Sequence, residues 1–195
     1  MAAKGWNDTS IDEITREAGV SRGLVSYHFK DKADLLSSML AHCEEAFSSA
    51  IAEAASRASD PLEQYRLGVR TALNYVQDDP AVYEIFLHFT ASGRSTAELG
   101  EQIRKLYRGF RVVTTFGIRK GQEEGVFRND IEPAAAAARH IGAITGLALQ
   151  WLLDPGAFPF ADAARQTEEM LVSYMVTGPR NVARKQPSLS LAGSR

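Results

Sequence analysis

The sequence has 195 residues and a mass of 21.3 kDa, and its 22 Lys and Arg nearly balance its 24 Asp and Glu. A hydrophobic content of 45% with 24% charged residues is typical of a globular protein and excludes a disordered chain. The single cysteine, Cys43, excludes a disulfide within one chain and a zinc site built from several thiolates. The apolar run at 141–153 is too short to span a membrane, and the N-terminus lacks the apolar core of a signal peptide. We therefore expect a cytoplasmic protein.

Apolar residues recur at intervals of three and four along most of the chain, and no segment alternates apolar and polar residues over six positions. The first spacing places side chains on one face of an α-helix, whereas alternation would indicate strands. We therefore predict an all-α protein.

Two short helices near the N-terminus are predicted to form a helix-turn-helix unit. The first begins after a cap at Thr9 or Ser10 and ends at Gly19. Ser21 caps the second, RGLVSYHF, at residues 22–29. Two short helices joined by a tight turn that contains glycine are typical of such a unit.

Six longer helices are predicted after this unit. Asp31 caps the first, which runs to about residue 59, and prolines at 61, 80 and 133 stand at first-turn positions of three others. A stripe of apolar residues from Leu99 predicts a helix that ends at Gly125, after a loop at 92–96. The last helix is expected from about residue 161 to residue 176.

The pattern divides the chain into a small unit at residues 1–32, a helical domain at residues 33–178 and a tail at residues 179–195. The tail lacks helical periodicity and carries no acidic residue. We expect it to be mobile.

The stretch from Gly5 to Leu36, GWNDTSIDEITREAGVSRGLVSYHFKDKADLL, resembles the DNA-binding signature of the TetR family of transcriptional regulators. The matching elements are the G-W-x-x-T-S start, the A-G-V-S turn, the R-G pair, the aromatic Y-H-F and the K-D-K before L-L. The segment EEGVFRNDIEPAAAA also resembles the loop and helix start that precede the penultimate helix in that family. The resemblance implies a DNA-binding helix-turn-helix unit followed by a larger helical domain for effector binding and dimerisation.

The resemblance also implies a full helix before Gly5, where this sequence has only MAAKG. We expect a misassigned start to account for the difference, with a truncation and a real loss as the alternatives. Residues 1–40 carry a net charge of −1, so the unit binds DNA only if its positive charges cluster.

The second short helix is expected to enter the major groove with its N-terminal residues against base edges. The guanidinium of Arg22 can bond to O6 and N7 of guanine, with a phosphate contact or a solvated charge as the alternative. Gly23 lets the backbone approach closely, and Leu24 meets a thymine methyl or packs in the core. Ser26, where many relatives carry tyrosine, is expected to contact a base or a phosphate.

Phosphate contacts are expected on both sides of this helix. The resemblance implies such contacts for Tyr27 and His28, although Tyr27 alternatively packs under the helix. Lys32 is expected to bind phosphate together with the N-terminus of the long helix. Thr9 and Ser10 are expected either to contact phosphate or to act only as caps.

The helix at 133–153 carries the signal for self-association. Its small residues at spacing four allow close approach of a partner helix, and it is apolar nearly all round, so it needs burial on two sides. The resemblance implies an intersubunit four-helix bundle with the last helix; burial within one subunit is the alternative. The expected interface residues are Ala138, Ile141, Gly142, Gly146, Leu152, Ala164, Leu171, Tyr174 and Met175.

The effector pocket is expected among the middle helices, where the resemblance places it. Aromatic residues at helical spacing are more often plain core, so each is a weak candidate on its own. His88 is a candidate polar anchor. The expected lining residues are Tyr65, Phe86, His88, Phe89, Tyr107, Phe110, Phe116 and Trp151.

Nothing in the sequence indicates catalysis. The four histidines show no metal-ligand spacing, and no glycine-rich phosphate loop is present. We therefore expect no enzyme, no cofactor and no metal. We predict a homodimeric repressor that binds a palindromic double-stranded operator through residues 21–29 and is released by a small-molecule effector. The alternative is a small-molecule-binding helical dimer that has lost DNA binding with its first helix.

Overall fold

The computed structural model describes residues 9–92 and 97–176. Within these ranges the chain forms eight α-helices and no strand, which confirms the predicted all-α class. None of the helices in these ranges combines the length and the apolar character needed to cross a membrane. The expectations for residues 1–8, for the loop at 93–96 and for the tail at 179–195 lie outside the described residues.

Two short helices, α1 (Ile11–Glu17) and α2 (Arg22–His28), form the N-terminal unit. Ser10 caps α1 in a capping box: its Oγ accepts from the backbone N–H of Glu13 at 3.2 Å, and Glu13 accepts from the backbone N–H of Ser10 at 2.9 Å. Gly19 makes the turn at φ +68°, a conformation that other residues rarely adopt. Ser21 caps α2 by accepting from the backbone N–H of Leu24. Both helices lie where the caps predicted them.

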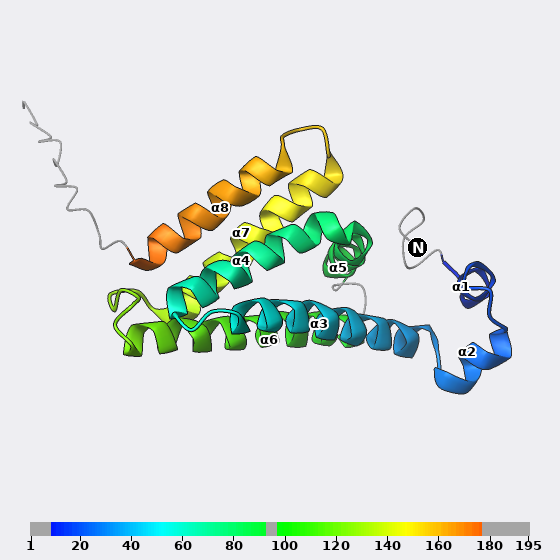
Figure 1. Ribbon diagram of the computed structural model, residues 1–195. Coiled ribbons are helices and arrows are strands. Elements are labelled where there is room, and N and C mark those ends of the chain that lie inside the picture. Colours follow the sequence, from blue (N-terminus) through cyan, green and yellow to red (C-terminus); the bar gives the residue numbers. More distant parts are fainter. Residues whose placement is uncertain (1–8, 93–96, 177–195) are drawn as a thin grey trace, which may run out of the picture.

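The long helix α3 (Lys32–Ser56) starts directly after this unit, capped by Asp31, whose carboxylate accepts from the backbone N–H of Asp34 at 2.9 Å. Figure 1 shows α1 and α2 at one end of the molecule, with α3 running from them along the larger body. The body continues through α4 (Pro61–Asp78), α5 (Pro80–Ser92), α6 (Ala97–Glu123), α7 (Pro133–Leu153) and α8 (Phe160–Val176). The three predicted prolines begin α4, α5 and α7, because a proline at the first helical position gives up no helical hydrogen bond.

Three clusters of buried side chains hold the body together. The largest joins α4, α5, α7 and α8 and includes Val69, Leu73, Tyr83, Ile144 and Leu171. A second joins α3, α5 and α6 through Leu36, Leu40, Phe89, Leu99 and Ile103. The third surrounds Ile118 and Phe127 and includes Met175. Apolar area removed from water in these clusters is the main source of stability for the fold.

A buried carboxylate also fastens α8 to α4. Arg70 donates to both oxygens of Glu168, at 2.9 and 2.7 Å, and Arg66 donates to one of them at 3.3 Å. Only 7% of the Glu168 side chain is exposed, so these charge-assisted bonds replace most of its hydration.

Candidate functional site

The helix α2 presents a surface that the rest of the described chain does not cover. None of its residues is buried, and Leu24 and Tyr27 are 49% and 83% exposed. Gly23, Ser26 and His28 are exposed as well. Large apolar and aromatic side chains left open on one short helix are typical of a binding surface.

The guanidinium of Arg22 points back across the helix-turn-helix unit. Its Nη1 donates to Oδ2 of Asp12 at 2.9 Å, and both side chains are more than half exposed. An exposed ion pair of this kind adds little stability, so Arg22 remains available for other partners at small cost. In the absence of another partner, the ion pair with Asp12 holds the guanidinium in this orientation.

The other residues expected to contact DNA occupy different environments. Thr9 is 6% exposed, and the Oγ of Ser10 is engaged in the capping box, so capping accounts for the position of Ser10. Lys32 is half-buried at the start of α3. The rings of Tyr27 and His28 meet edge to face, with centroids 5.1 Å apart.

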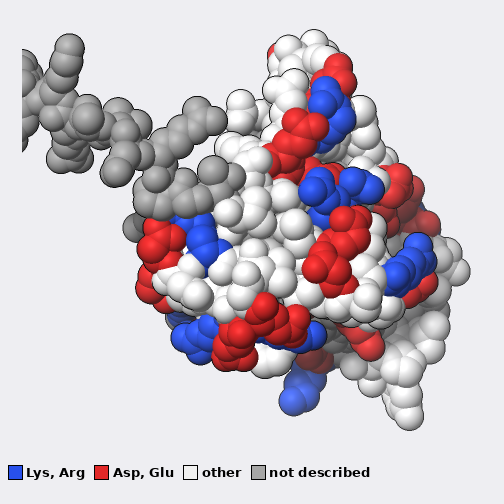
Figure 2. All heavy atoms as spheres, turned by 60° about the vertical axis from the view of Figure 1, so that its left-hand side comes forward, with Lys and Arg blue, Asp and Glu red and all other residues white. Residues whose placement is uncertain are grey.

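The opposite end of the molecule has mixed charge. Figure 2 views the molecule from the side where α8 ends, and there Lys and Arg are interspersed with Asp and Glu. Arg128 pairs with Asp130, and Lys120 lies 3.8 Å from Glu124. This face therefore offers no electropositive stripe of the kind that binds a nucleic acid backbone.

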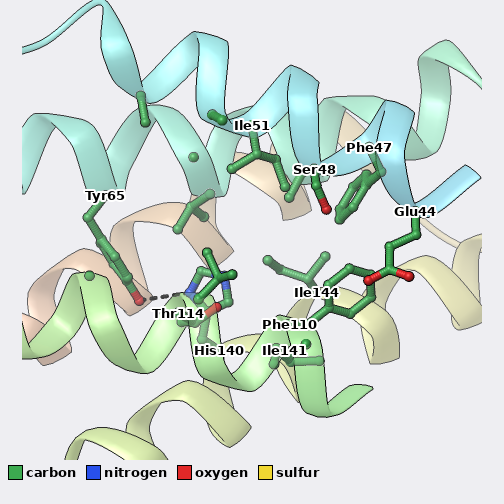
Figure 3. Close-up of a pocket in the computed structure, with 18 of the residues that line it drawn as sticks. Glu44, Phe47, Ser48, Ile51, Tyr65, Phe110, Thr114, His140, Ile141 and Ile144 are labelled. Carbon is green, nitrogen blue, oxygen red and sulfur yellow. Dashed lines mark hydrogen bonds between the residues drawn. The ribbon is translucent and has the colours of Figure 1, made fainter. Parts of the chain in front are cut away.

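A cavity of about 380 Å³ lies between α3, α4, α5, α6 and α7. Its volume falls in the range of small-molecule sites, and its walls are mainly apolar and aromatic with a few polar groups. Phe47, Tyr83, Phe86 and Phe110 contact one another at one end, with ring centroids 5.7–6.4 Å apart. The carboxylate of Glu44 lies beside Phe110 at this end (Figure 3).

A histidine and a tyrosine form the main polar feature of the wall. Nδ1 of His140 on α7 lies 3.0 Å from the hydroxyl of Tyr65 on α4, and their rings meet at 5.4 Å (Figure 3). Burial lowers the pKa of His140 to about 4 and raises that of Tyr65. Both groups are therefore uncharged at neutral pH.

Four of the residues expected to line an effector pocket line this cavity. Tyr65, Phe86, Tyr107 and Phe110 line it. Phe89 does not, because it packs in the cluster of Leu36 and Leu40. Phe116 is 71% exposed, and Trp151 packs against Phe160 at 5.0 Å; neither lines the cavity. The side chain of His88 lies outside the described residues.

Sequence reasoning missed the contributions of α3 and α7 to this wall. Glu44, Phe47 and Ile51 come from α3, and His140 and Ile144 come from α7. The spacing of Phe47 and Ile51 already indicated one apolar face of α3, and His140 is a polar residue within an apolar helix. Those two signals would have identified these wall residues.

The residues expected at a dimer interface divide into two groups. Ala138 and Gly142 are exposed on α7 and Gly146 is half-buried; a methyl group added at either glycine would meet nothing within 4 Å. The rest are engaged within the chain. Ala164 and Leu171 belong to the largest buried cluster, and Leu152 packs against it. Met175 belongs to the third cluster, and Tyr174 packs against that one. Ile141 lines the cavity.

Three of these inward-facing residues are already buried within one chain. The core of one chain already buries Ala164, Leu171 and Met175, because α8 packs against α4 and α7. Their side chains are therefore not on an open surface. The exposed apolar residues of the two helices are instead Leu149, Leu153, Met170 and Val176.

No group of three or more His, Cys, Asp or Glu in the described ranges is arranged to hold a metal ion.

Comparison with known proteins gives two family matches. Residues 1–39 match the DNA-binding region described as bacterial regulatory proteins, tetR family. Residues 61–175 match the C-terminal domain described as BetI-type transcriptional repressor.

Among curated proteins, the transcriptional regulator BetI of Proteus mirabilis is 28% identical over 174 residues, which cover 86% of this chain and 82% of that protein. The fatty acid metabolism regulator protein of Bacillus subtilis is 20% identical over 89% of this chain and 88% of its own length.

Solved structures share the fold. The regulator FadR from Bacillus subtilis, in complex with stearoyl-CoA, superposes with a TM-score of 0.77 at 19% identity, covering 89% of this chain and 92% of that one. AibR, in complex with isovaleryl coenzyme A and operator DNA, superposes with a TM-score of 0.70 at 16% identity, covering 88% and 91%.

Proposed function

Because the chain belongs to the TetR family of transcriptional regulators, with a C-terminal domain of the BetI type, we propose that it is a homodimeric repressor. In this proposal α2 of each subunit binds one half of a palindromic operator in the cytoplasm. A small molecule in the cavity releases the protein from DNA. The DNA-binding unit ends near residue 32 and the effector and dimer domain follows it.

The observation that carries this proposal is the double role of α3. Its first turn begins directly after the helix-turn-helix unit, and its later residues Glu44, Phe47 and Ile51 form a wall of the cavity. One rigid helix of 25 residues therefore connects the two sites. A ligand that moves this wall also moves the base of the DNA-binding unit.

A second connection runs through the cluster of Leu36, Leu40 and Phe89. Ile14 of α1 packs against this cluster, and so does Tyr107 of α6, which also lines the cavity. The same packed side chains thus contact both the DNA-binding unit and the cavity wall. Such a cluster has to rearrange when either end moves.

Two structural neighbours support a small-molecule effector. FadR was determined with stearoyl-CoA, and AibR was determined with isovaleryl coenzyme A together with operator DNA. The mainly apolar cavity of this chain suits an apolar group, such as the acyl groups of those two ligands.

The dimer is proposed to form through the outward face of α7 with α8. Ala138, Gly142, Gly146, Leu149 and Leu153 follow one another at spacings of four, four, three and four, so they lie on one face of α7. The open space at the two glycines allows two α7 helices to approach closely. On α8, Met170 is also an exposed apolar residue.

The required coupling is modest. Release by a hundredfold change in operator affinity needs about 2.7 kcal/mol of difference between the ligand affinities of the two conformations. One or two hydrogen bonds and some apolar contact, made in one conformation only, supply that amount.

The test measures binding of the chain, and of a version extended upstream in frame, to duplex DNA from the region before its own gene. Measurements at two salt concentrations with competitor DNA separate specific from non-specific binding. Sedimentation analysis determines whether the protein is a dimer. Specific, salt-sensitive binding by a dimer is expected. A folded dimer that fails to bind in both versions would instead favour the ligand-binding protein without DNA binding.

A further inference from the structure

We propose that the cavity binds an uncharged, mainly apolar molecule that carries a carbonyl group, and that the carbonyl oxygen accepts a hydrogen bond from Nε2–H of His140. Esters, thioesters, ketones and secondary amides with an aliphatic or aromatic body belong to this class. The inference rests on the proposed effector site and adds the chemistry by which that site selects its ligand.

His140 has one ring nitrogen engaged and the other directed to the cavity. Nδ1 meets the hydroxyl of Tyr65 at 3.0 Å, and no described residue is recorded as a partner of Nε2. In the described part of the chain, every side-chain nitrogen or oxygen that is fully buried has a hydrogen-bond partner. Since Nε2 has none, it is not fully buried, and His140 is a residue of the cavity wall. Nε2 is therefore accessible from the cavity, where a ligand can reach it.

The Tyr65 hydroxyl determines which hydrogen bond Nε2 makes. A neutral imidazole has one N–H donor and one bare nitrogen acceptor, and the bond at one nitrogen fixes the role of the other. A phenol is a good donor and a weak acceptor, whereas a bare imidazole nitrogen is a strong acceptor, so Tyr65 donates to Nδ1. Nε2 then carries the hydrogen and presents a donor to the cavity. A carbonyl oxygen is the complementary group.

The charged groups around the cavity do not favour an ion at this position. Glu44 lies at the aromatic end, on the opposite side of the cavity from Tyr65 in Figure 3. Lys120, the cationic wall residue, is 47% exposed and lies 3.8 Å from Glu124. Burial lowers the pKa of His140, and no charged side chain contributes to that shift. A carboxylate or ammonium there would lose hydration without gaining an opposite charge, which costs several kcal/mol.

The hydroxyl groups near His140 leave its Nε2 as the clearest donor. Thr145 donates its hydroxyl hydrogen to the backbone oxygen of Ile141 at 2.8 Å, so that hydrogen is already committed. Thr114 on α6 lies close to His140 in Figure 3 and is a second polar group for the ligand. The rest of the wall is mainly apolar and recognises the ligand chiefly by apolar contact.

The test uses four probes with similar aliphatic bodies: 2-undecanone, 2-undecanol, decanoate and decyltrimethylammonium. Binding to the full chain is measured by titration calorimetry at pH 7.5, below the micellar range of each probe. The ketone and the alcohol are expected to bind, and both ions at least tenfold more weakly. Tighter binding of either ion than of the ketone, or no binding of any probe, would overturn the inference.

Two substitutions test the role of the histidine. In His140→Phe an aromatic ring is kept and the Nε2–H donor is lost, so ketone affinity should fall about three- to tenfold, the equivalent of one neutral hydrogen bond. In Tyr65→Phe the ketone can still select the tautomer with the hydrogen on Nε2, so its affinity should fall less than about twofold. Tyr75→Phe is the control, since Tyr75 lies on α4 and does not line the cavity. Unchanged ketone affinity in His140→Phe would contradict the assignment.

A parallel measurement separates this inference from the proposed function. Operator affinity is determined with and without 2-undecanone. Probe binding without any change in DNA affinity leaves the ligand chemistry supported and rejects release by an effector of this class. DNA binding and release by one of the ions, with no ketone binding, supports the regulator and rejects the carbonyl-binding site.

Discussion

Replacing Glu168 by glutamine should destabilise the protein by about 2–3 kcal/mol. The substitution keeps the shape of the side chain and removes its charge, whereas Arg66 and Arg70 remain. Hydrogen bonds to charged groups contribute roughly 1.5–3 kcal/mol each, and breaking a fully buried pair costs about 3–5 kcal/mol. The exposed fractions of Arg66 and Arg70, 30% and 49%, reduce the second figure, since both guanidiniums regain water.

The pH dependence gives an independent check. Burial raises the pKa of Glu168. The hydrogen bonds and charges of Arg70 and Arg66 lower this pKa by more than burial raises it, so the net shift is downward. A folded-state pKa below the unfolded value means that the carboxylate stabilises the fold above the unfolded pKa. That stabilisation is lost as the pH falls through the folded pKa. The difference between the native protein and Glu168→Gln should therefore shrink below about pH 4.

Urea unfolding at pH 7 and at lower pH, at one fixed protein concentration, measures both effects. Glu169→Gln is the matched control, because Glu169 is the next residue of α8 and pairs with Arg165 in an exposed ion pair at 3.0 Å. That control should lose less than about 0.5 kcal/mol. Equal losses in the two variants, or a difference that does not change with pH, would refute the assignment of stability to the buried carboxylate.

Three further predictions concern DNA binding and assembly. Arg22→Ala should weaken operator binding by about 1–3 kcal/mol and relax the preference at one base position, measured by anisotropy with a panel of substituted duplexes; unchanged affinity and preference would contradict base reading. Lys32→Ala should weaken all sequences alike and lower the salt slope by about one, unlike the α6 control Lys105→Ala; a loss confined to one sequence would contradict a phosphate contact. Gly142→Gln should raise the dimer dissociation constant at least about tenfold in sedimentation equilibrium, while Val112→Gln on α6 leaves it unchanged; an intact dimer would exclude this face of α7.

Local signals predicted the helices well. Ser10, Ser21 and Asp31 cap α1, α2 and α3 as expected, and Gly19 and Gly125 adopt φ values of +68° and +73° after helix ends. Caps, helix-opening prolines and left-handed glycines act on backbone groups within a few residues, so the sequence alone contains the information.

The environment of each apolar face was harder to predict. Periodicity shows which residues share a face, but not which element that face meets. Phe86 and Phe89 are three residues apart on α5, yet Phe86 lines the cavity and Phe89 packs in a closed cluster. Trp151 meets Phe160 across the turn between α7 and α8, which no helical spacing indicates.

The same limitation applies to α8. Leu171 and Met175 were expected at a subunit interface, because the family resemblance implies a four-helix bundle between subunits. Leu171 packs in the cluster that includes α4, and Met175 packs with Ile118 and Phe127. Glu168 joins α8 to α4 through ion pairs with residues 98 and 102 positions earlier. A contact at that separation depends on the whole fold, so local spacing does not reveal it.

The two faces of α7 have different roles in the proposed mechanism. His140 and Ile144 line the cavity, whereas Gly142 and Leu149 lie on the outward face assigned to the dimer. A helix is rigid over its length, so a ligand that pulls His140 inward also shifts the surface on which the two subunits meet. The ligand thus acts on α3 within each subunit and on α7 between subunits. In this mechanism both displacements change the distance between the two α2 helices of the dimer. Because the two half-sites of an operator lie a fixed distance apart on DNA, operator affinity depends on the distance between these helices.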